Sequence, residues 1–217
     1  MHWETLCVLG SVALAVNAPV AAQAASPTFD CGKASSSIEK LICSDAELAA
    51  RDRKLDEVFK AALAKSRGPL GRELRQQQHG WVKGRDDCWK ADGQEAWITA
   101  SWSVNTVRAC VDAQYRLRTS ELQALWRLLP PKTLAFSCQG DPAKEVVASA
   151  FDTDPRTIRL ERGDRTQTLW RVGAAGSALD GLYEGQNVSL VHEGRPLKLN
   201  WLDTRSGKTE AWQCTPR

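Results

Sequence analysis

The sequence lacks the patterns that metal sites, membrane spans and nucleic-acid surfaces require. Its 217 residues include three histidines (His2, His79 and His192), and none of the seven cysteines forms a CxxC pair, so no metal site is expected. No apolar run is long enough to span a bilayer comfortably. The net charge of +3 is too small to indicate a nucleic-acid partner. No nucleophile lies beside a histidine and no carboxylate pair has a catalytic spacing, so we expect neither an enzyme nor a cofactor.

The first 24 residues read as a cleaved signal peptide. Leu6–Val16 is a short apolar core, and Ala22-Gln23-Ala24 offers small residues for signal peptidase, although the segment before the core has no lysine or arginine. The alternative is a buried apolar segment. Cys7 precedes the apolar core, so we do not expect it to carry a lipid. The sequence therefore predicts a periplasmic or secreted protein.

The six cysteines that follow the signal form an even set, which predicts disulfides in an oxidising compartment. Three pairings of the first four are formally open, and we favour the two that close short local loops. The last two cysteines lie near the start and the end of the second half of the chain. The expected pairs are Cys31–Cys43, Cys88–Cys110 and Cys138–Cys214.

Residues 25–128 have the periodicity of helices. Ser44 and Glu47 have the spacing of a capping box, and a helical pattern follows as far as Arg67-Gly68-Pro69. A second helix is expected from Leu70 and a third from Asn105, ending before the proline pair at 130–131. These helices predict a small antiparallel bundle held by disulfides.

Residues 132–217 alternate between apolar and polar side chains, with frequent turn residues. This pattern predicts seven to eight short antiparallel strands, which most simply close into a small barrel. The expected fold class is therefore α+β in two domains, a disulfide-bonded helical bundle followed by a β-barrel.

The first half resembles the N-terminal domain family named after the lysozyme inhibitor LprI, over about residues 29–126. Four cysteines and their flanking residues agree in order. The matching stretches are Phe29-Asp30-Cys31-Gly32-Lys33-Ala34, Ile38–Cys43, Asp45 to Leu55, Trp81 to Cys88, and Cys110 to Leu122.

The stretch Trp89–Ser103 is longer than this resemblance implies, and it carries Trp89, Trp97 and Trp102. These rings either pack against the end of the bundle or form a contact surface for a partner or a glycan. The polar residues nearest the cysteines are expected to form a structural ion-pair network. They are Arg85, Asp86, Asp87 and Arg118.

The second half, over about residues 133–214, resembles the membrane-bound inhibitors of c-type lysozyme, the MliC-like family. The matching stretches are Phe136-Ser137-Cys138, Phe151–Pro155, Ile158-Arg159-Leu160 and Trp212-Gln213-Cys214. In that family an SGxxY loop and a YxxxTKG hairpin enter the enzyme's cleft. Their serine and lysine meet the two catalytic carboxylates there.

This resemblance places a recognition loop at residues 176–194. Tyr183 and Gly194 fit the two motifs, whereas Ser177 lies six residues before the tyrosine instead of four. Glu193 occupies the lysine position, and His192 the threonine position. Arg195 could supply the missing cation, as could His192 at low pH. Glu193-Gly194 can equally be an ordinary hairpin turn. The candidate lysozyme-binding residues are Ser177, Asp180, Tyr183, His192, Glu193 and Arg195.

Two functions from different classes follow. The first is a lysozyme inhibitor whose expected partner is a c-type lysozyme; because these enzymes are generally basic, the positive charge of this chain disfavours fast association. The second is a non-inhibitory envelope module that binds peptidoglycan or another envelope protein through the tryptophan-rich stretch.

Overall fold

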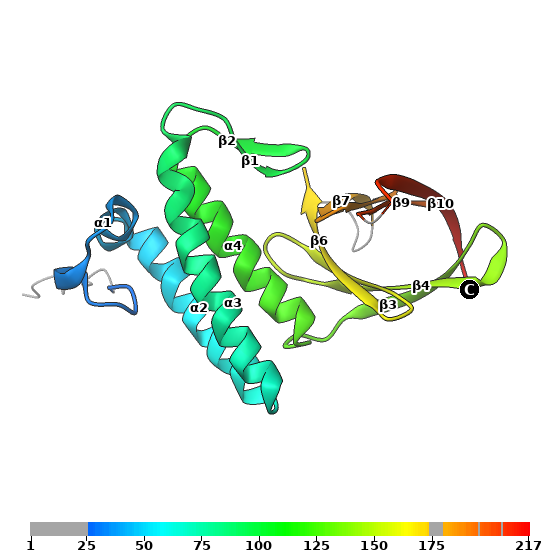
Figure 1. The fold of residues 1–217 in the computed structure, drawn as a ribbon, viewed down its shortest axis with the longest axis horizontal. Helices are drawn as coiled ribbons and strands as arrows, with labels where there is room; N and C mark the ends of the chain where they lie inside the picture. The colour runs from blue at the N-terminus through cyan, green and yellow to red at the C-terminus, as the bar shows by residue number, and fades with distance from the viewer. Residues whose placement is uncertain (1–25, 174–179, 195, 205) are drawn as a thin grey trace, which may run out of the picture.

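The structure is a computed structural model that describes residues 26–173, 180–194, 196–204 and 206–217. The signal-peptide prediction lies outside these residues. A helical region comes first and a β-barrel follows, so the expected α+β layout is confirmed (Figure 1). No helix in the described part of the chain is long and apolar enough to cross a membrane.

The helical region contains four α-helices, one more than expected, and a hairpin. The 3-10 turns are η1 (Cys31–Lys33) and η2 (Asp87–Ala91), the helices are α1 (Ser37–Ser44), α2 (Ala46–Lys65), α3 (Pro69–Asp86) and α4 (Val107–Leu125), and the hairpin strands are β1 (Ala96–Thr99) and β2 (Trp102–Val104). A capping box begins the extra helix α1: the Ser36 hydroxyl accepts from the Glu39 amide, and the Glu39 carboxylate accepts from the Ser36 amide.

The capping box expected at Ser44 and Glu47 was wrong. Ser44 is the last residue of α1, and its hydroxyl donates to the Leu41 carbonyl. Asp45 caps α2 instead, because its carboxylate accepts from the amides of Glu47 and Leu48 at 3.0 Å each. A carboxylate at this position also lies against the positive end of the helix dipole, which a serine hydroxyl does not exploit.

The barrel contains eight antiparallel strands, as expected, and it is closed. Its strands are β3 (Lys132–Cys138), β4 (Asp141–Phe151), β5 (Thr157–Arg162), β6 (Arg165–Val172), β7 (Gly181–Gly185), β8 (Val188–His192), β9 (Leu197–Asp203) and β10 (Lys208–Pro216). Closure pairs the last strand with the first, and the Cys138–Cys214 disulfide joins residues that are register partners in this pair. The other disulfides are Cys31–Cys43 and Cys88–Cys110, so all three pairs are those expected from the sequence.

Two separate apolar cores form. One fills the barrel with inward-facing side chains such as Phe136, Ile158 and Leu190, and the other lies among the helices around Leu48, Leu55 and Tyr115. Inward and outward positions alternate along each strand. Part of the outward face of β4, β5 and β6 is covered, however, because α4 packs against these strands (Figure 1).

Candidate functional site

The predicted recognition loop lies at one end of the barrel. Antiparallel neighbours place alternate connections at opposite ends. The β4–β5, β6–β7 and β8–β9 connections therefore share one end, which we call the loop end and which comprises the described residues 152–156, 173, 180, 193, 194 and 196. The predicted site residues Ser177 and Arg195 lie outside the described residues.

The structure brings Asp180 and His192 together at the loop end. Gly181, next to Asp180, is the register partner of His192, and Asp180 Oδ1 lies 2.8 Å from His192 Nδ1. The Asp180 side chain is 47% exposed and that of His192 is 18% exposed. Glu193 is exposed beside them, and Gly194 follows with φ +90°, a left-handed backbone conformation that suits glycine. Asp180, His192 and Glu193 thus form one polar rim.

Tyr183 is separated from that rim by burial. Its side chain is fully buried in the barrel core, in register between Arg171 of β6 and Leu190 of β8. Burial raises the pKa of its phenol. The Arg171 guanidinium lies 6.0 Å from the centre of its ring. Tyr183 therefore supports the strand that leaves the recognition loop from inside the barrel, and a docked partner does not touch it in this conformation.

Two inward-facing arginines at the loop end were not predicted. The Arg171 amide donates to the Arg156 carbonyl at 2.8 Å, and the Arg156 guanidinium pairs with Asp152 at 3.3 Å. The signal was present in the sequence: both residues continue the inward alternation, Arg156 two residues before Ile158 and Arg171 two residues after Leu169.

One row of side chains on the outer wall of the barrel faces the helical region. Phe151, Thr157, Trp170 and Glu184 are successive register partners across β4 to β7. Trp170 Nε1 donates to Ser120 Oγ of α4 at 3.1 Å. At the tip of the β1–β2 hairpin, the amide and the hydroxyl of Ser101 donate to the Glu184 carboxylate at 2.9 and 2.7 Å.

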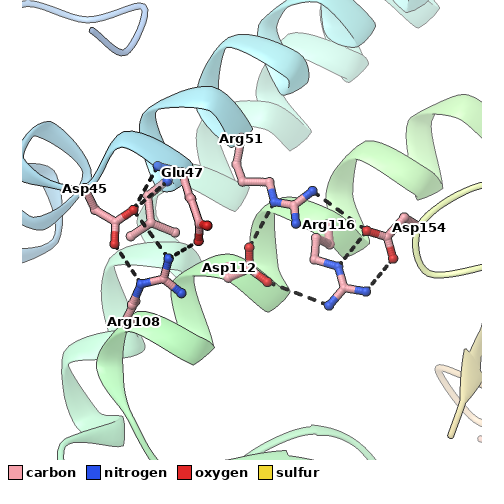
Figure 2. Close-up of polar contacts among 8 residues, drawn as sticks. Asp45, Glu47, Arg51, Arg108, Asp112, Arg116 and Asp154 are labelled. Carbon is pink, nitrogen blue, oxygen red and sulfur yellow. Dashed lines mark hydrogen bonds and ion pairs between the residues drawn. The ribbon is translucent and has the colours of Figure 1, made fainter. Parts of the chain in front are cut away.

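A charged chain along α2 and α4 reaches the loop end (Figure 2). Arg51 Nε lies 2.9 Å from Asp112 Oδ1, and the Arg116 guanidinium contacts both Asp112 and the Asp154 carboxylate of the β4–β5 connection. A groove of about 340 Å³ runs beside these groups, between α2, α4 and residues 152–154. The helical region therefore supports the loop end directly. The further contacts of Arg108 with Asp45 and Glu47 join the starts of α4 and α2.

The tryptophans of the 89–103 stretch divide into two kinds. Trp89 is 58% exposed and Trp97 is 62% exposed, whereas Trp102 is half-buried. Ala96 and Val104, which are register partners, pack against the helical core, so the opposite face of the hairpin carries Trp97 outward. Only part of the predicted aromatic surface is therefore accessible.

The polar residues near the cysteines are held by partners. Arg85 is buried and donates to the Tyr115 hydroxyl at 2.9 Å and to Asp86, while Tyr115 donates to the buried Asp52 at 2.8 Å. Burial raises the pKa of Tyr115 well above its ordinary value. Arg118 pairs with Glu121, and Asp87 with Lys90. Among the described residues no cluster of three or more metal-ligating side chains forms.

Comparisons with known proteins agree with the helical resemblance. The family model described as "Lysozyme inhibitor LprI" matches residues 31–122. The chain is 27% identical over 185 residues to "Lipoprotein LprI" of Mycobacterium bovis and of Mycobacterium tuberculosis, covering 82% of this chain and 85% of those proteins. No solved structure matches significantly. Because the helical region is less than half of the chain, this similarity extends into the barrel. The helical region is thus similar to the LprI lysozyme inhibitors, and the chain as a whole to the lipoprotein LprI.

Proposed function

We propose that this protein is an exported, non-enzymatic inhibitor of c-type lysozyme. The observation that carries the proposal is the match of residues 31–122 to the lysozyme inhibitor family, together with a similarity to LprI that extends beyond the helices. The exported location is in keeping with three disulfides.

The proposed mechanism is obstruction of the enzyme's cleft by the loop end of the barrel. Asp180, His192 and Glu193 form the described rim, and Ser177 and Arg195 belong to the same connections. A cation such as Arg195 would pair with a catalytic carboxylate and exclude the glycan. Tyr183 supports this rim from the core, where it lies beside Arg171.

The test follows the lysis of cell walls by a c-type lysozyme in the presence of the purified protein. We expect inhibition that weakens in Arg195→Ala. The matched control is Arg165→Ala, because Arg165 is an exposed arginine at the opposite end of the barrel. Undiminished lysis at a large molar excess of the wild-type protein would refute inhibition of this enzyme class. Equal inhibition by wild type and Arg195→Ala would remove Arg195 from the mechanism.

A second candidate function is a non-inhibitory envelope module, favoured by the exposure of Trp89 and Trp97. Exposed aromatic rings can stack on the sugars of peptidoglycan, and they can equally contact another envelope protein. Sedimentation with isolated cell wall distinguishes the candidates. Retention of the protein without any lysozyme, together with unimpeded lysis, supports the module over the inhibitor.

A further inference from the structure

The end of the helical region carries an exposed patch that combines aromatic rings with carboxylates. The patch consists of Trp89, Asp92, Glu95 and Trp97, and we call it the acidic tip. The described residues include four exposed large hydrophobic side chains, and two of these are the tryptophans of the tip. Such a concentration within nine residues distinguishes the tip from scattered exposed side chains, which need no explanation.

The acidic tip is held rigidly from beneath. Cys88 is buried and forms the disulfide with Cys110 of α4, and Ala91 is fully buried in the helical core. Trp89 lies between these two anchors and points outward. A side chain that is ordered before binding loses less conformational entropy when a partner docks, so its contacts contribute more fully to affinity.

The hairpin fixes the other half of the tip. Trp97 of β1 is the register partner of Ser103 of β2, whose hydroxyl donates to the Glu95 carboxylate at 2.7 Å. The carboxylate therefore lies on the same outward side of the hairpin as the Trp97 ring. β1 also packs against η2 and α4, which joins the hairpin to the turn that carries Trp89.

The net charge of the acidic tip is opposite in sign to the net charge of the whole chain. Residues 87–97 hold three carboxylates and one ammonium group, a net charge of −2, whereas the whole chain carries +3. Lys90 is paired with Asp87 at 2.8 Å. Among the described residues no cation pairs with Asp92 or Glu95, and both are exposed.

This composition fits a basic protein surface. Tryptophan is enriched among residues that dominate protein–protein affinity, and its ring attracts cations. The ring of Trp89 already has a cation near it, since the Lys90 ammonium lies 5.7 Å from the ring centre. Arginine or lysine side chains of a partner would meet carboxylates and rings together, and the local negative charge would favour the encounter.

We infer that the acidic tip is a docking surface for a basic protein, and specifically that it contacts lysozyme. This inference rests on the proposed function and adds a second contact surface to the loop end of the barrel. It also removes the difficulty posed by a positively charged inhibitor of a basic enzyme, because the charge that the enzyme meets at the tip is negative.

The test measures the dissociation constant of the full-length mature protein with a c-type lysozyme by titration calorimetry. The double variant Trp89→Ala/Trp97→Ala is expected to bind roughly tenfold or more weakly, because it removes both rings. The matched control is Leu70→Ala, which truncates another exposed hydrophobic side chain, 53% exposed on α3, and should bind within about twofold of wild type.

A second pair of variants tests the charge. Asp92→Asn/Glu95→Gln should weaken binding severalfold at about 0.05 M salt and much less at about 0.5 M salt, because salt screens exposed charges. The control Glu73→Gln alters an exposed carboxylate on α3 and should have little effect. If the wild type binds lysozyme and the double tryptophan variant binds equally well, the docking surface is refuted while the proposed function stands. If the wild type does not bind lysozyme, the docking surface and the proposed inhibitor function are both refuted.

Discussion

The helical region and the barrel stabilise their cores by different means. The helices are joined by two disulfides that close short loops, and their core contains a buried polar network of Asp52, Tyr115 and Arg85. The barrel has one disulfide between residues 76 apart, and a single cluster of buried hydrophobic side chains forms its core. The small bundle therefore depends on specific local links, whereas the barrel depends on closing a long chain upon itself.

The largest expected difference concerns the disulfides. Replacing Cys138 and Cys214 with serine should lower the free energy of unfolding of the barrel by about 4 kcal/mol, because the lost cross-link closes 76 residues. Replacing Cys31 and Cys43 should cost the helical region about 3 kcal/mol, since that loop spans 12 residues. Urea unfolding followed by circular dichroism measures both. A smaller loss for the long loop would contradict the chain-entropy explanation of this contrast.

The next prediction compares the two tyrosines of the chain, one in each core. Tyr115→Phe should lower the free energy of unfolding by about 2 kcal/mol, because it leaves the buried Arg85 and Asp52 without their shared hydroxyl. Tyr183→Phe should cost about 1 kcal/mol, since it removes the hydroxyl that meets Arg171 but keeps the buried ring and its contact with the same guanidinium. Denaturant midpoints of the two variants give the comparison. Equal losses would mean that the two cores do not differ in polar dependence.

A smaller effect is expected where the two regions meet. Glu184→Gln should weaken the attachment of the hairpin to the barrel by about 1 to 2 kcal/mol. The reason is that an NH₂ group, which cannot accept, replaces one of the two carboxylate oxygens that accept from Ser101. Hydrogen exchange at the Ser101 amide should accelerate. Glu193→Gln, a change at an exposed glutamate of the same barrel, serves as the control and should leave that exchange rate unaltered.

The smallest effect is a pH dependence in the helical region. The Leu48 amide, followed by Arg108, holds the pKa of Asp45 below its ordinary value of 3.8. A carboxyl whose pKa is depressed on folding adds stability above its unfolded pKa, and this stability is lost as the pH falls through the folded pKa. Asp45→Asn should therefore cost roughly half a kcal/mol at neutral pH and nothing at a pH well below 3.8. Thermal unfolding at both pH values measures this, and a cost that persists in acid would contradict it.

Local sequence patterns predicted most of the helices and strands but missed the shortest helix and the shortest strands. Alternation in the second half gave the barrel, and helical spacing gave α2, α3 and α4. The eight-residue α1 was missed because so short a helix shows too few turns of periodic pattern to be recognised. The serines at 35–37 also leave its first residue ambiguous, since each could be the cap. The β1–β2 hairpin was missed because two strands of this length have little stability of their own, and Ser101 at its tip is held by Glu184, 83 residues away.

The positions of the candidate site residues do not follow from the sequence, for a related reason. The sequence predicts a recognition loop at residues 176–194, and among its described residues the strand register places Tyr183 in the core and Asp180 against His192 on the rim. The contribution of Arg156 and Arg171 depends on two strands meeting at the same end of a closed barrel. A short motif carries no information about such neighbours.

From the sequence follow the types of the larger elements and the two-part layout, because these depend on local periodicity and turn residues. Cysteine spacing only favoured the disulfide pairs that form, since other pairings of the first four cysteines stayed open. Only the tertiary structure decided how the parts meet. The contacts of Ser101 with Glu184 and of Arg116 with Asp154 join residues 83 and 38 positions apart. These contacts depend on the strand register, because the register decides which side chains line up in one outward row. That row is the surface that α4 and the hairpin cover.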